Sequence, residues 1–147
     1  MPTAKDVARY FISLSEPSTP FAITPLKLQK LIYYAQGWYM AFKGEALYED
    51  ELKAWEHGPV VPELYYDYRH LGYLTIHPEP FENRINGKRI FTKTQLELLQ
   101  EVWEAYGEYD GKYLEELTHQ EDPWLNTNHN QTIEKTRIKK YFKSLMN

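Results

Sequence analysis

The chain has 147 residues, a net charge of −4 and no cysteine. The lack of cysteine excludes disulfides, thiol catalysis and thiolate metal sites, and the negative charge argues against a dedicated nucleic-acid-binding protein. This length suits one domain with an adequate hydrophobic core, and we expect a single domain over residues 1–147. No apolar run is long enough to span a bilayer and no signal peptide is visible, so we expect a cytoplasmic protein.

The first predicted helix begins at Thr3, and the proline- and hydroxyl-rich residues 15–20 predict a loop. The second predicted helix, residues 25–43, is the centre of the fold. Thr24 suits its N-cap, Pro25 its first turn and Gly44 a left-handed C-cap.

Apolar side chains recur at helical spacing along residues 25–43 and predict a helix with other elements packed on more than one side. Tyr34 and Trp38 widen this apolar stripe. We place three basic residues at the solvent edge of the helix: Lys27, Lys30 and Lys43. The stripe itself consists of Leu28, Leu31, Ile32, Ala35, Tyr39 and Phe42.

The middle of the chain contains shorter elements. An extended segment around Leu52, Ala54 and Trp55 is expected to lead into a turn at Gly58-Pro59. A helix should follow from about residue 62 to residue 72, with Leu64, Tyr65, Tyr68 and Leu71 on its buried face. The dipeptide Asn86-Gly87 predicts a two-residue β-hairpin, because both positions tolerate left-handed backbone.

The last third predicts three or four helices. Thr92 and Gln95 fit a capping box before a helix that ends at Gly107. Asp110 caps the next helix, and Asp122-Pro123 repeats a cap-plus-proline pattern. Residues 126–131 predict a loop, and residues 134–145 a final helix that buries Ile138, Tyr141 or Phe142, and Leu145. We therefore predict a mainly α fold, a compact bundle of about six helices around residues 25–43 with a small antiparallel β-hairpin.

The densest polar segment is residues 115–124. His119 with Glu115, Glu116 or Asp122 could form a general-base pair or part of a metal site, with His57 or His129 supplying a further ligand. The simpler interpretation is structural: Asp122 caps a helix, while Thr118 and His119 close the preceding one. We favour the structural interpretation and expect no catalytic residues, metal or cofactor.

Charge and aromatic content point to binding instead. Aromatic residues make up 16% of the chain, and Tyr and Trp are enriched at interfaces, although a tyrosine-rich core is the plainer alternative. Residues 135–147 contain five basic residues and no acidic one. Because the whole chain has a net charge of −4, residues 1–134 carry −9. That basic segment predicts a solvated helix face, with contact to phosphates or to an acidic partner as alternatives. Its charges are Lys135, Arg137, Lys139, Lys140 and Lys143.

Three segments, residues 26–38, 54–65 and 117–124, are distinctive when taken together. They contain Gln29-Lys30, Trp55-Glu56-His57-Gly58-Pro59 and Thr118-His119. In order and spacing they resemble the Panacea antitoxin domain, a phage-associated family formerly described as a domain of unknown function. The resemblance extends from about residue 25 to residue 142. The family's motif positions correspond to Leu28, Gln29, Lys30, Tyr34, Trp38, Trp55, Gly58, Pro59, Thr118, His119, Asp122, Pro123 and Trp124.

The resemblance implies a non-enzymatic bacterial or prophage antitoxin that neutralises a toxin, its operon neighbour, by direct contact. Residues 1–24 offer one helix and a loop, too little for the DNA-binding domain fused to some family members. Most motif residues are of types that pack or turn, so we favour a role in the fold. A contact surface of exposed aromatics on the acidic body would suit a basic toxin. The alternatives are a DNA-binding regulator using the basic C-terminal helix and a hydrolase centred on His119 and Asp122.

Overall fold

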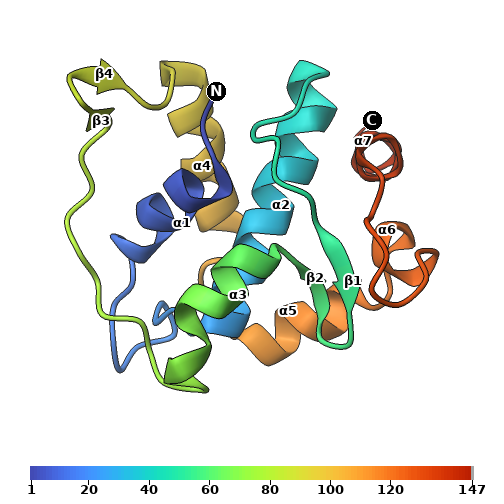
Figure 1. Cartoon of the computed structure of the whole chain (residues 1–147), viewed down its shortest axis with the longest axis horizontal. Helices are drawn as coiled ribbons and strands as arrows, with labels where there is room; N and C mark the ends of the chain where they lie inside the picture. The colour runs from blue at the N-terminus through green and yellow to red at the C-terminus, as the bar shows by residue number, and fades with distance from the viewer. Residues whose placement is uncertain (147) are drawn as a thin grey trace.

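The computed structural model describes residues 1–146 and is mainly α-helical (Figure 1). These residues form seven α-helices, one 3-10 helix and two small antiparallel hairpins. The helices are α1 (Ala4–Ile12), α2 (Pro25–Lys43), α3 (Pro62–Tyr68), the 3-10 helix η1 (Arg69–Leu71), α4 (Lys93–Tyr106), α5 (Gly111–Thr118), α6 (Asp122–Leu125) and α7 (Lys135–Ser144). The strands are β1 (Lys53–Trp55), β2 (Gly58–Val60), β3 (Arg84–Ile85) and β4 (Lys88–Arg89).

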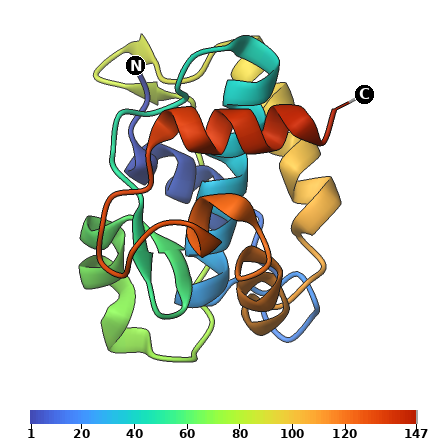
Figure 2. The ribbon, with the colours of Figure 1, turned by 90° about the vertical axis from the view of Figure 1, so that its right-hand side faces the viewer.

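Helix α2 is the centre of the molecule, as predicted. Thr24 accepts a hydrogen bond from the backbone N–H of Lys27, and Gly44 closes the helix with φ of 80°. Helices α1 and α4 lie on one side of α2 and α7 on the other (Figure 1). Seen from the side, α7 crosses in front of α2, and a Cβ atom on Gly37 would overlap the Phe142 ring (Figure 2). The missing side chain therefore permits this close crossing.

Two expectations about the faces of α2 are wrong. Lys27 and Lys30 are each only 1% exposed, because both ammonium groups reach backbone carbonyls inside the fold. Lys43 is exposed, as expected. Phe42 was predicted to be buried but is 54% exposed, at the C-terminal end of α2.

The segment around Trp55 is one arm of a hairpin rather than an isolated extended run. Lys53 pairs with Val60 and Trp55 with Gly58, so the turn lies at Glu56-His57 and not at Gly58-Pro59 as predicted. Thr132 bridges to Lys53 on the outer edge of β1. The predicted Asn86-Gly87 hairpin is confirmed as β3–β4, with positive φ at both turn residues.

Capping predictions hold at most helix starts. Thr92 and Asp110 each accept the expected backbone hydrogen bond, and Thr3, where the first helix was expected to begin, is the N-cap of α1. Asp122 does not cap α6: Glu121 occupies the N-cap position, and Asp122 is the first helical residue.

Two expectations of burial at the surface helices are also wrong. Tyr65 is 43% exposed and Leu145 is 47% exposed, because α3 and the end of α7 are covered on one side only. Tyr68, Leu71 and Tyr141 are half-buried, while Leu64, Ile138 and Phe142 are buried as predicted. Within residues 1–146, no helix combines the length and the hydropathy needed to cross a bilayer.

Candidate functional site

Four motif residues from three separate segments meet inside the protein. The Nζ atom of Lys30 donates to the carbonyl oxygen of Pro59 over 2.8 Å. Gly58 has φ of 106°, and a Cβ atom there would lie 2.7 Å from Oγ1 of Thr118 and 2.9 Å from Cε of Lys30. Only glycine allows α2, β2 and α5 to approach one another this closely.

Burial dominates the electrostatics around Lys30. It lowers the pKa of the Lys30 amine to about 7, and the nearby Glu115 carboxylate opposes that shift. Glu115 is itself buried and lies 3.2 Å from Nδ1 of His57. Lys112 completes the group, with its Nζ atom 3.8 Å from the same carboxylate. The arrangement joins β2 to α2 and α5.

Two glutamine amides on α2 hold extended segments in place. Gln29 donates to the Val61 carbonyl over 3.1 Å and accepts from the Val61 N–H over 2.9 Å. Gln36 pairs in the same way with the carbonyl of Tyr48 and the N–H of Leu47. Each amide side chain pairs with a backbone N–H and a backbone C=O group, as a neighbouring β-strand would. Without it these buried groups would have no hydrogen-bond partner. Gln36 was not among the residues singled out from sequence, although it occupies the equivalent helix face seven positions on.

A buried carboxylate anchors the start of α6 to α2. The two oxygens of Glu121 accept hydrogen bonds from the hydroxyls of Tyr33 and Tyr34, over 3.0 and 2.9 Å. Burial raises the pKa of Glu121 to about 7, and the two tyrosine hydrogen bonds act against that rise. Tyr34 also stacks on Tyr106 with centroids 4.0 Å apart, and the Tyr106 hydroxyl accepts from Nε1 of Trp38. Burial raises the pKa of Tyr34, so it remains a neutral donor.

The remaining motif aromatics join the hairpin to α6. Nε1 of Trp124 donates to the Trp55 carbonyl over 2.8 Å, and Nε1 of Trp55 donates to Asn130 over 3.0 Å. The His119 ring stacks on Trp124 with centroids 4.0 Å apart. Its buried Nε2 atom has no hydrogen-bond partner within residues 1–146. Trp55, His119 and Trp124 are half-buried and lie nearer the surface than Lys30.

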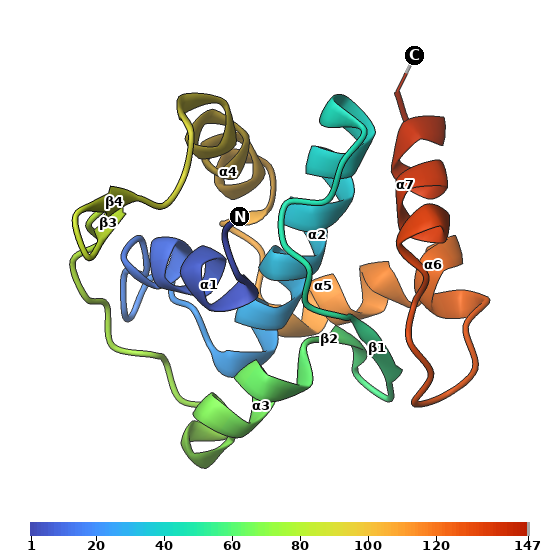
Figure 3. The ribbon, with the colours of Figure 1, turned by 45° about the horizontal axis from the view of Figure 1, so that its top comes forward.

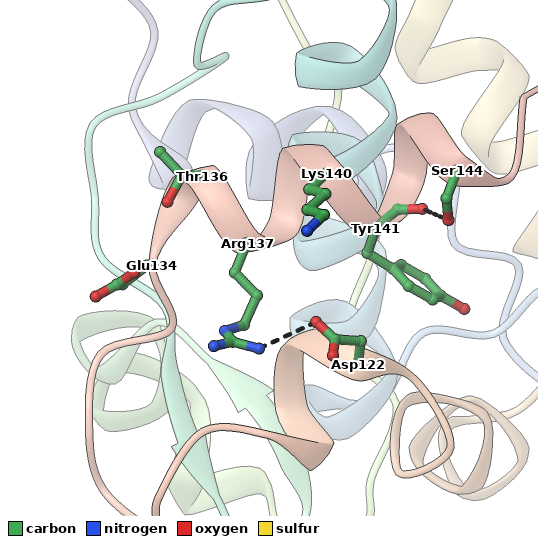
Figure 4. A pocket seen from close by; sticks show the side chains of 7 residues that line it. All are labelled: Asp122, Glu134, Thr136, Arg137, Lys140, Tyr141 and Ser144. Atoms are coloured by element: carbon green, nitrogen blue, oxygen red, sulfur yellow. Dashed lines mark hydrogen bonds and ion pairs between the residues drawn. The ribbon is translucent and has the colours of Figure 1, made fainter.

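Asp122 lies apart from this interior, at a surface pocket beside α7 (Figure 4). Its carboxylate accepts from Arg137 over 3.3 Å and from Asn126 over 2.6 Å. The cavity has a volume of about 410 Å³ and is open to solvent. It is lined by Asp122, Glu134, Thr136, Arg137, Lys140, Tyr141 and Ser144.

The structure does not join His119 to Asp122. Each is engaged with other groups, His119 with the Trp124 ring and Asp122 with Arg137, and no hydrogen bond connects the two within residues 1–146. His57 contacts Glu115 instead, and His129 is exposed in the loop before α7. In the part of the chain that the structure describes, no three metal-ligating side chains cluster together.

The basic helix α7 uses several of its charges within the fold. Lys135 donates to the carbonyl of Glu49 and Lys139 to that of Gly44, both over 3.1 Å. Arg137 pairs with Asp122. Only Lys140 and Lys143 remain without such a contact among residues 1–146. Two cations are few for binding the phosphates of a nucleic acid.

The exposed aromatics of α3 were not identified from the sequence. Tyr65 and Tyr66 are 43% and 57% exposed. The Tyr65 ring lies beside Trp55 and the Tyr66 ring beside Arg69. The clustering of Tyr65 and Tyr66 beside Arg69 was the available signal, but helical spacing assigned Tyr65 to the core.

The comparisons with known proteins identify a family. The family model described as "Antitoxin SocA-like, Panacea domain" matches residues 28–125, which include all but the first turn of α2, both hairpins and α3 to α6. No curated protein and no solved structure matches the chain. The matched range includes all the motif residues that meet around Lys30 and Trp55. This chain therefore belongs to the SocA-like antitoxin family with the Panacea domain.

Proposed function

We propose that this chain is an antitoxin that neutralises a toxin protein by holding it in an inactive complex. Membership of the SocA-like Panacea family is the observation that carries this proposal. The toxin is the product of the adjacent gene, in a toxin–antitoxin or prophage module. The chain acts by contact and needs no metal, cofactor or catalysis of its own.

The arrangement of the motif residues supports a binding role. Lys30, Gly58, Pro59 and Thr118 are committed to contacts within the fold. They build a stable platform, and the partner is left to less buried positions. Side chains on a rigid scaffold lose little conformational entropy on binding, which favours a tight complex.

The test is co-expression with the adjacent gene under separate inducible control. Induction of the neighbour alone should stop growth, and induction of both should restore it. A tag on this chain should then recover the neighbour in a stable complex. Unrestored growth, with both proteins present at detectable levels, would overturn the proposal.

A DNA-binding role has a direct control in the same cells. The double variant Lys140→Ala/Lys143→Ala removes the two exposed cations of α7 that form no hydrogen bond or ion pair within residues 1–146. An antitoxin acting by contact elsewhere should rescue growth equally well with this variant.

A further inference from the structure

Four side chains form a continuous row on the surface of β1, α3 and η1. The ring centroids of Trp55 and Tyr65 are 5.2 Å apart, and those of Tyr65 and Tyr66 are 5.5 Å apart, with edge-to-face geometry in both pairs. The guanidinium carbon of Arg69 lies 5.1 Å from the Tyr66 centroid. We call Trp55, Tyr65, Tyr66 and Arg69 the aromatic row.

The aromatic row is open to solvent. Tyr66 is 57% exposed, Tyr65 43%, and Trp55 is half-buried. Neither tyrosine hydroxyl takes part in a hydrogen bond within residues 1–146. Isolated exposed apolar residues need no explanation, but an adjoining Trp, two Tyr and an Arg are the residue types that dominate binding hot spots.

The row is also held rigidly at the Trp55 end. The Trp55 carbonyl accepts from Trp124, and its indole N–H is bound by Asn130, so both backbone and ring are fixed. The buried Leu64 anchors α3 directly before Tyr65. A preorganised aromatic surface keeps more of its interaction energy as affinity, because fewer rotamers are lost on binding.

Acidic side chains flank the row, together with two cations, Arg69 within it and Lys53 on the same strand as Trp55. Glu56 lies in the turn next to Trp55 and forms no ion pair within residues 1–146, while Glu63 and Asp67 on α3 share one cation, Lys5. Residues 1–134 carry a net charge of −9. The compensating basic helix α7 lies well away from α3 in each view of the molecule (Figures 1 and 3). The net negative charge of the domain that carries the row therefore favours a positively charged partner.

We propose that the aromatic row is the toxin-contact surface, and that it receives a basic segment of the toxin with an arginine or lysine side chain over the ring of Tyr65, beside the Tyr66 ring that Arg69 already contacts. This inference rests on the proposed function above. Cations are attracted to the faces of aromatic rings, and the tyrosine hydroxyls are available to donate to backbone carbonyls of the bound segment. Glu56 adds a charge at the rim that favours encounter with a basic partner.

A second exposed tyrosine pair provides a matched control. Tyr109 and Tyr113 are 38% and 48% exposed, and their rings stack on each other with centroids 4.6 Å apart. The pair has the same residue types and similar exposure. It lies at the junction of α4 and α5, outside the elements β1, α3 and η1 that carry the aromatic row.

The experiment measures binding of the purified product of the adjacent gene, captured on a sensor surface, at about 0.15 M salt. Compared with the unaltered chain, Tyr65→Ala/Tyr66→Ala should weaken the affinity at least about 30-fold, the effect of one hot-spot loss. Tyr109→Ala/Tyr113→Ala should change it by less than about threefold. Glu56→Lys should slow association at low salt and leave dissociation unchanged. Circular dichroism checks that each variant remains folded.

The outcomes separate the two proposals. If the unaltered chain binds and Tyr65→Ala/Tyr66→Ala binds equally well, the aromatic row is not the contact surface, while the antitoxin role stands. If the unaltered chain does not bind its neighbour, the antitoxin role fails and the row loses its assigned partner. Light scattering could instead show that this chain forms a dimer, and that the same double variant disrupts the dimer without affecting toxin binding. The aromatic row would then bind a second copy of the chain, and the proposed basic segment would be wrong.

Discussion

The ammonium group of Lys30 and the carbonyl oxygen of Pro59 form a hydrogen bond of 2.8 Å in the interior of the protein. The bond ties the central helix to the second strand of the motif hairpin. Gln29, one position earlier, binds the backbone of Val61 just beyond that strand. These neighbouring polar contacts fix the hairpin on α2, and with it the base of the aromatic row.

Truncation of Lys30 should therefore be costly. Lys30→Ala leaves a cavity and an unpaired Pro59 carbonyl, and should lower the free energy of unfolding by about 3 kcal/mol. Lys30→Met retains the apolar stem and should cost less than half as much. Urea unfolding at pH 8, followed by circular dichroism, measures both. Equal stability of Lys30→Ala and the unaltered chain would show that the contact contributes nothing.

Stability should rise with pH above neutrality. The folded-state pKa of Lys30 is about 7 against an ordinary 10.5, so above pH 7 the unfolded chain binds more protons than the folded one. The free energy of unfolding then increases with pH, by up to about 1.4 kcal/mol per pH unit for one proton. Lys27, with a pKa of about 8, adds to this rise. Urea titrations between pH 7 and pH 9 should show a smaller slope for Lys30→Met, and unchanged slopes would contradict the assignment.

Glu121 should produce the opposite trend on the acidic side. Its folded-state pKa of about 7 lies above the ordinary 4.5, so between these values the folded chain binds the extra proton. Stability contributed by this group is therefore present at low pH and is lost as pH rises through 7. Subtracting the pH profile of Glu121→Gln from that of the unaltered chain should isolate this slope between pH 5 and pH 7. The exposed Glu101→Gln is the control, and a similar difference profile for both variants would exclude Glu121 as the source.

Substitution of Gly58 should be more damaging than substitution of another glycine with positive φ. Gly72 has φ of 57°, and a Cβ atom added there would meet no atom within 4 Å, so Gly72→Ala should cost only the backbone strain, about 1 to 3 kcal/mol. Gly58→Ala adds to such strain a clash with Thr118 and Lys30, which should cost about 1 to 3 kcal/mol more. Thermal unfolding compares the two variants directly. Equal losses of stability would show that the packing of α2, β2 and α5 around Gly58 can accommodate a Cβ atom.

The lysines of α7 should divide into two classes. Lys135→Ala/Lys139→Ala removes two contacts to backbone carbonyls and should lower the free energy of unfolding by about 1 to 2 kcal/mol. Lys140→Ala/Lys143→Ala should change it by less than about 0.5 kcal/mol. The comparison is made by urea unfolding at one pH. If the second pair proved the more destabilising, the assignment of α7 as a packed helix with two outward cations would be wrong.

Local signals predicted the helix ends well. Thr24, Pro25 and Gly44 bound α2, and Thr92 with Gln95 opens α4, because caps depend on residues only a few positions apart. The Asn86-Gly87 turn was predictable for the same reason. Panacea family membership could also be recognised from the motif segments alone.

Long-range partners were not predictable from local pattern. Lys27 and Lys30 were assigned to solvent because lysine is rarely buried, and nothing near them in sequence indicates that Gly107 and Pro59 would supply carbonyls. Asp122 resembled an N-cap, yet its partner Arg137 lies fifteen residues away. The pairing of β1 with β2 places Gly58 inside a strand and not in a turn. Glycine is required there because a Cβ atom would clash with Thr118 and Lys30. The aromatic row depends on the same pairing, since it sets Trp55 beside α3.

The central claim is that this chain inhibits by direct contact, and calorimetric titration of the purified chain into the purified product of the adjacent gene tests it most directly. We predict saturable binding with a fixed stoichiometry and a dissociation constant below about 1 μM, about −8 kcal/mol of binding free energy. The proposed contact between a basic toxin segment and this acidic domain predicts that affinity falls as salt is raised. Growth rescue in cells without measurable binding of the purified proteins would contradict direct neutralisation and point to an indirect mechanism.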